Sequence, residues 1–133
     1  MKRLAFGLVA AFALGASALA QEFQPYPTPK ITVQQWVGYL ALIKSRLETT
    51  EQAFPELQLI VFTDYATRTQ YTFTASGHPA HPAWIARQVV DENGKVNVRQ
   101  IGYFAGSEEQ FDVLFRTYLK LHAQMQQDSD KRR

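Results

Sequence analysis

The sequence contains no cysteine, which excludes disulfide bonds, a thiol nucleophile and a cysteine-linked lipid. Outside the N-terminus it also lacks an apolar run near the roughly 20 residues that a membrane-spanning helix needs. Its 133 residues leave room for one domain only. With 46% hydrophobic and 13% aromatic residues, the composition is typical of a folded chain and argues against intrinsic disorder.

The N-terminal residues have the order of a secretory signal peptide. Lys2 and Arg3 precede an uncharged apolar stretch, and Ala18-Leu19-Ala20 gives a small-x-small cleavage pattern. We therefore predict that residues 1–20 are a signal peptide, that no membrane span remains after cleavage, and that the protein is periplasmic or secreted.

The excess of basic residues, 14 against 12 acidic residues, gives no support to nucleic-acid binding. Removal of the signal peptide takes away Lys2 and Arg3 and no acidic residue, so the remaining chain is formally neutral. Several of its remaining basic residues lie in the C-terminal Lys131-Arg132-Arg133. Nucleic-acid binding needs a basic face, and the sequence indicates none.

The rest of the chain divides into a lead-in, one domain and a tail. Residues 21–30 contain Pro25, Pro27 and Pro29 and should form a stiff, extended lead-in. We predict a single α+β domain over residues 31–126 and a charged, disordered tail over residues 127–133.

A helix is expected at each end of this domain. Thr32 with Gln35, and Ser107 with Gln110, have the spacing of capping boxes. The first helix should end before Pro55. Apolar residues at helical spacing predict the buried stripes, which are Val33, Trp36, Val37, Leu40, Ile43 and Leu47 in the first helix and Phe111, Leu114, Phe115, Tyr118, Leu121, His122 and Met125 in the last.

Between the helices, runs rich in β-forming residues predict four strands: Leu57–Asp64, Gln70–Ala75, Ala83–Asp91 and Lys95–Phe104. The simplest fold is a four-stranded antiparallel meander with both helices packed on one face, in the order α-β-β-β-β-α. Asn93-Gly94 predicts a tight hairpin between the last two strands. An exposed sheet edge also offers a surface for a homodimer.

The register of the last hairpin decides how two arginines are placed. A two-residue loop pairs Glu92 with Lys95 and puts Arg87 and Arg99 on opposite faces. A three-residue loop would set the two arginines directly across from each other, where their charges repel. We favour the two-residue loop, and we regard both arginines as candidate ligand-binding residues.

Two aromatic residues form a second candidate. Trp84 and Tyr103 approach each other across the hairpin and could give a platform for a peptide or glycan. Aromatic residues on a sheet more often pack in the core.

The segment Ser76-Gly77-His78-Pro79-Ala80-His81-Pro82 is the most unusual in the sequence. His78 and His81 could bind zinc or copper through neutral imidazoles, with a third ligand from His122, Asp64 or Met125. Two histidines alone do not complete a zinc pattern, and His-Pro pairs also suit a plain turn. For His122, a place in the core is the simpler expectation.

The sequence thus favours a non-enzymatic exported binding or protein-interaction module, with an unknown protein or a small molecule as ligand. The alternative is a metal-binding protein that uses His78 and His81; otherwise no cofactor is indicated. A small hydrolase has the weakest support, because Ser76 lies outside any Gly-x-Ser-x-Gly motif.

Overall fold

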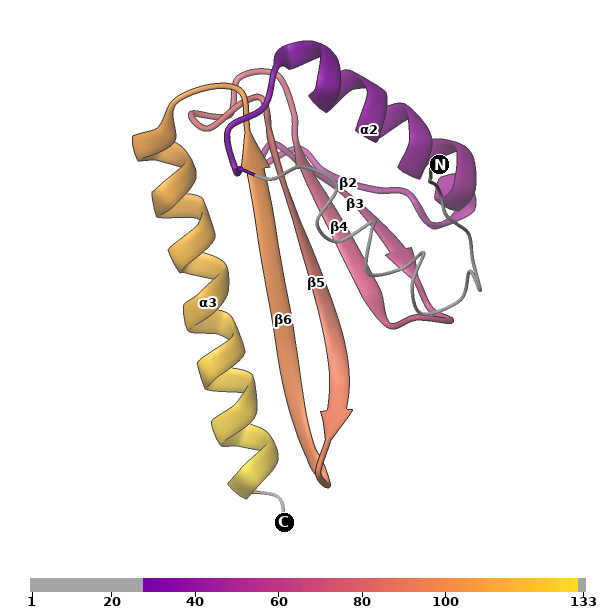
Figure 1. The fold of residues 1–133 in the computed structure, drawn as a ribbon, viewed down its shortest axis with the longest axis vertical. Coiled ribbons are helices and arrows are strands. Elements are labelled where there is room, and N and C mark those ends of the chain that lie inside the picture. Colours follow the sequence, from indigo (N-terminus) through magenta and orange to yellow (C-terminus); the bar gives the residue numbers. More distant parts are fainter. Residues whose placement is uncertain (1–27, 132–133) are drawn as a thin grey trace, which may run out of the picture.

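The computed structural model describes residues 28–131, with side chains up to Leu121. The predicted signal peptide and residues 21–27 of the lead-in lie outside this range. The elements in chain order are α2 (Val33–Leu47), the 3-10 helix η1 (Glu48–Thr50), β2 (Gln52–Phe54), β3 (Leu59–Asp64), β4 (Thr69–Thr74), β5 (Ala83–Glu92), β6 (Lys95–Phe104) and α3 (Glu108–Lys131) (Figure 1). α3 continues past residue 126, where we expected the domain to end.

The strands form one antiparallel meander in the order β2-β3-β4-β5-β6. The α+β class and the antiparallel sheet are therefore confirmed. Within the β5–β6 hairpin, Asn93 and Gly94 both have positive φ, at 52° and 77°. Glu92 pairs with Lys95, so the two-residue loop is confirmed as well.

The prediction of four strands is wrong, because the sheet has five. The extra strand, β2, pairs with β3 from Gln52↔Val61 to Phe54↔Leu59. α2 ends at Leu47, before Pro55 as expected, and one 3-10 turn leads into this strand, which we did not predict. All of β2 is exposed, so it has no buried alternating residues by which its sequence could reveal a strand.

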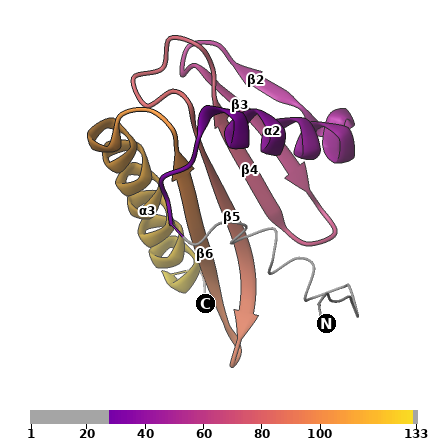
Figure 2. The ribbon, with the colours of Figure 1, turned by 45° about the horizontal axis from the view of Figure 1, so that its top comes forward.

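The two helices pack on opposite faces of the sheet, which corrects the prediction of a shared face (Figures 1 and 2). On β5, Trp84 and Ala86 belong to the core cluster of α2, whereas Ala83 and Ile85 belong to the cluster of α3. Successive residues of a strand point to opposite faces. The run of four buried apolar residues is typical of a strand covered on both sides.

The α2 face holds the larger, aromatic core. Thr32 and Gln35 form the predicted capping box at the start of α2. The helix buries Trp36, Tyr39 and Ile43, whereas Val33 and Val37 are about half exposed. The buried stripe is thus rotated from the one we predicted, because Tyr39 replaces the two valines.

The α3 face holds a smaller core. Ser107 accepts a hydrogen bond from the Gln110 backbone, as predicted for the cap. Phe111 is buried and stacks on Phe104, with ring centroids 5.0 Å apart. Three partly buried residues pack against this cluster, namely Leu114, Phe115 and Tyr118. Leu121 is 42% exposed. The side chains of His122 and Met125 lie outside those described.

The start of the described chain attaches to the end of β6. Lys30 forms a parallel bridge with Phe104, in which Ile31 N–H donates to the Phe104 carbonyl and Phe104 N–H donates to the Pro29 carbonyl. Between residues 28 and 131, neither helix is long and apolar enough to cross a membrane.

Candidate ligand-binding groove

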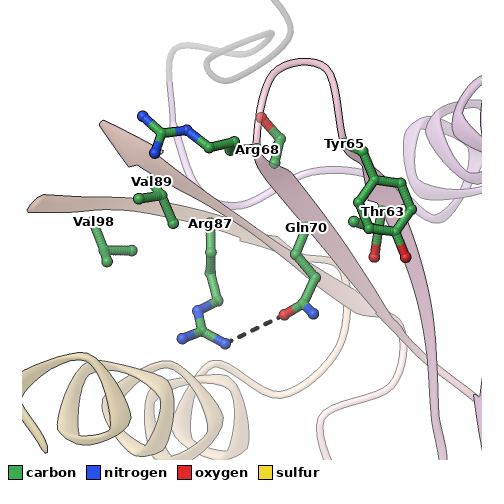
Figure 3. Close-up of a pocket in the computed structure, with 8 residues that line it drawn as sticks. Thr63, Tyr65, Arg68, Gln70, Arg87, Val89 and Val98 are labelled. Carbon is green, nitrogen blue, oxygen red and sulfur yellow. Dashed lines mark hydrogen bonds between the residues drawn. The ribbon is translucent and has the colours of Figure 1, made fainter. Parts of the chain in front are cut away.

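A groove of about 510 Å³ opens on the sheet face that carries α3 (Figure 3). Strands β3, β4, β5 and β6 contribute side chains to it. Its lining consists of Thr63, Tyr65, Arg68, Thr69, Gln70, Arg87, Val89 and Val98. Figure 3 shows Arg87, Gln70 and Val98 on the side of the sheet that faces α3.

A row of four polar side chains crosses the sheet at this groove. The register places Thr63 opposite Gln70, Gln70 opposite Arg87, and Arg87 opposite Gln100. Direct cross-strand partners point to the same face of a sheet, so the four side chains form a continuous row. All four residues are half-buried. The row therefore places four hydrogen-bonding side chains where they are partly shielded from water.

Arg87 is the charged member of this row. Its Nη1 donates to Gln70 Oε1 at 3.3 Å, and its guanidinium carbon lies 4.9 Å from the centre of the Tyr118 ring. Burial lowers the pKa of Arg87 from its ordinary value, and the neighbouring Tyr118 phenol partly opposes this shift. An arginine still remains charged near neutral pH. The sheet and α3 thus hold a half-buried cation in place.

Gln100 closes the row at β6. Its Nε2 donates to the Phe115 backbone carbonyl at 3.0 Å and so links β6 to α3. Its Oε1 is buried and has no hydrogen-bond partner in the described part of the chain. This acceptor adds a polar atom beside Arg87.

The rim of the groove carries an ion pair. Arg68 Nη2 lies 2.8 Å from Asp91 Oδ2, and both side chains are at least half exposed. Such surface pairs contribute little to stability. Tyr65, at 77% exposure, stands at another part of the rim.

The two arginines that we predicted as ligand-binding residues lie on opposite faces of the sheet. Arg87 lines the groove, whereas Arg99 pairs with Gln88 on the opposite face. Arg99 is well exposed and lies 3.7 Å from Glu92. The pair therefore does not form one site.

Trp84 and Tyr103 lie next to each other as expected, with ring centroids 4.9 Å apart. They are only 0% and 4% exposed, because Tyr39 of α2 covers Trp84. Their position is that of core residues and offers no exposed platform to a ligand.

His78 and His81 both use their Nδ1 atoms within the protein. His78 Nδ1 accepts a hydrogen bond from Ala80 N–H at 3.0 Å, and His81 Nδ1 lies 2.8 Å from Thr74 Oγ1. The His81 ring also packs edge-on against Trp36, at 5.0 Å. No group of three or more His, Cys, Asp or Glu residues suited to a metal occurs among the residues whose positions are described. A metal site in this loop remains a hypothesis.

Several residues at the groove were not predicted from the sequence as site residues. Gln70, Val89 and Val98 come from three different strands, and Tyr118, which lies against Arg87, comes from α3. The alternation of β4, β5 and β6 gives the face of each residue, but only the pairing of all three strands brings them together. The β5–β6 register was the one signal that could have joined Val89 with Val98.

The chain matches no protein-family model, no curated protein and no solved structure. Its function therefore has to be inferred from the groove itself.

Proposed function

We propose that the protein is an exported binding module whose groove holds a small anionic ligand. The half-buried guanidinium of Arg87, at the centre of the polar row, is the observation that carries this proposal. The groove has the size of a small-molecule site, and a few polar groups stand among apolar ones, as is usual in such sites.

Charge favours an anion over a neutral ligand. Arginine presents several N–H donors in a plane that matches a carboxylate, and such charge-assisted bonds are about twice as strong as neutral ones. Partial burial strengthens the attraction further, because less water screens it. The Gln70 amide beside Arg87 supplies a further polar contact.

The lining favours binding over catalysis. None of the eight lining residues is a histidine, a carboxylate, a lysine or a cysteine. A general base for hydrolysis would come from those residue types in most enzymes.

Export is part of the proposal and rests on the signal-peptide pattern of residues 1–20. The intact mass of the protein from the periplasm or the culture medium tests it. We expect a mature N-terminus at Gln21. A mass that retains Met1 to Ala20, found in the membrane fraction, would contradict export.

Binding can be tested with hexanoate and its neutral amide, hexanamide, as probes in NMR titrations of labelled protein. We expect hexanoate to shift amide signals of β4 and β5 and hexanamide to have little effect. Arg87→Met should abolish the response. Arg99→Met is the matched control, because Arg99 lies on the opposite face. Equal binding of hexanoate by the Arg87→Met variant would overturn the proposal.

A further inference from the structure

The row next to the polar one is apolar. Val89 and Val98 are direct cross-strand partners, one step closer to the hairpin turn than Arg87 and Gln100. They point to the same face as Arg87, and both are half-buried and line the groove. An apolar strip therefore begins beside the guanidinium.

α3 lies on the same face of the sheet as this strip. Its contacts advance along the β5–β6 hairpin toward the turn: Phe111 packs on Phe104, the Phe115 carbonyl accepts from Gln100, and the Tyr118 ring lies against Arg87. Leu121 is one helical turn beyond Tyr118, in the direction of the hairpin turn (Figure 1).

Packing between α3 and the sheet loosens along this direction. Phe104 and Phe111 are 4% and 5% exposed, whereas Leu121 is 42% exposed and Val98 is half-buried. Apolar groups on the helix and on the sheet thus remain accessible just where the polar row ends.

We propose that the ligand is a free aliphatic carboxylate whose carboxylate meets Arg87 and whose unbranched chain lies along Val89 and Val98, below Leu121. This inference rests on the proposed function and specifies the ligand class of the same groove. The charge of the guanidinium and the adjoining apolar strip match the two ends of such a molecule.

The strip also limits the chain length. The five steps from Arg87 to Glu92 along β5 span about 17 Å at roughly 3.4 Å per step. A longer chain would pass the hairpin turn and reach water. Affinity should therefore rise with chain length for carboxylates that are shorter than this span.

The test measures dissociation constants for acetate, butanoate, hexanoate and octanoate by NMR titration, below their micelle concentrations. Burial of each methylene contributes about 0.8 kcal/mol, so the dissociation constant should fall about fourfold per added methylene. Arg87→Met should weaken every member of the series.

Val98→Thr keeps the side-chain shape but makes the strip polar, so it should weaken octanoate several-fold and leave acetate unchanged. Val90→Thr is the matched control, because Val90 is also half-buried but points to the other face of β5. Thermal melts establish that both variants are folded.

The outcomes separate this inference from the proposed function. If all four carboxylates bind equally and depend on Arg87, the anion site stands and the aliphatic ligand class is wrong. Equal losses of octanoate binding in the Val98→Thr and Val90→Thr variants would also overturn the inference. If no carboxylate binds, or if octanoate binds the Arg87→Met variant fully, both proposals fail.

Discussion

The ring of Tyr39 lies flat on the indole of Trp84, with centroids 4.1 Å apart and planes inclined by 15°. This stack joins the middle of α2 to the start of β5. The neighbouring Trp36 donates its indole N–H to the Ala83 carbonyl at 2.9 Å. Together these contacts fix the position of α2 on β5, and α3 packs against the opposite face of the same strand.

The α3 core should be sensitive to the loss of Phe111. Phe111→Ala should lower the free energy of unfolding by about 3–5 kcal/mol, because it leaves a cavity against Phe104. Arg116→Ala, at an exposed position of the same helix, should change it by less than about 0.5 kcal/mol. Urea denaturation of both variants measures the difference. Equal effects would mean that the faces of α3 are misassigned.

Two glycines should respond to alanine in opposite directions. A Cβ at Gly102 would lie 2.7 Å from Phe111 Cζ and 3.1 Å from Phe115 Cδ1, so Gly102→Ala should destabilise the protein by about 1–3 kcal/mol. A Cβ at Gly38, on the exposed side of α2, meets nothing within 4 Å. Gly38→Ala should therefore stabilise it by about 0.5–1 kcal/mol. Thermal melts measure both effects, and an unchanged or raised melting temperature for Gly102→Ala would contradict the packing of α3 on β6.

Tyr71 should make stability depend on alkaline pH. Burial, and secondarily the charge of Asp64, raises the pKa of Tyr71 to about 12, with Arg46 opposing. The unfolded chain loses this proton near pH 10, so the stability that the neutral phenol provides is present below about pH 10 and is lost as the pH rises toward about 12. Unfolding free energies measured across this range should fall more steeply for the wild type than for Tyr71→Phe. Identical slopes would exclude this role.

His78 should make the stability of the protein decrease at acid pH. Burial, and secondarily the charge of His81, lowers the pKa of His78, and its Nδ1 must be unprotonated to accept from Ala80 N–H. The unfolded chain therefore takes up the proton first, and stability falls as the pH drops below about 6.5. Urea unfolding near neutral and at mildly acid pH measures the loss, which His78→Asn should reduce. An unchanged loss in that variant would assign the acid sensitivity to another group.

Local signals predicted most of the secondary structure. The Thr32 and Ser107 caps, the Asn93-Gly94 turn and the alternation of β4 each depend on a few neighbouring residues, so the sequence contains them in full. Strand β2 could not be predicted in this way. It pairs with β3 through backbone hydrogen bonds, which depend little on the side chains of β2.

Contacts between residues far apart in the sequence decide which side of the sheet each helix covers and which residues meet in the groove. The buried run from Ala83 to Ala86 indicates that β5 is covered on both sides, but it does not say which helix covers which side. Arg87 was predicted as a binding residue from the hairpin alone. Its neighbours Gln70 and Tyr118 come from β4 and α3, and tertiary packing places them there.

Pro29 restricts how the incoming chain can align at the bridge between Lys30 and Phe104. The next bond of a parallel ladder would need an N–H at residue 29, and Pro29 has none. A slip of two residues would preserve the side-chain faces, but it would put Pro29 in the place of Ile31 and lose the bond to the Phe104 carbonyl. Pro27 and Pro25 follow at the same spacing, so further slips of two fail in the same way. Prolines at every second position thus block shifts of the incoming chain in one direction and favour the alignment in which the Ile31 N–H donates to the Phe104 carbonyl.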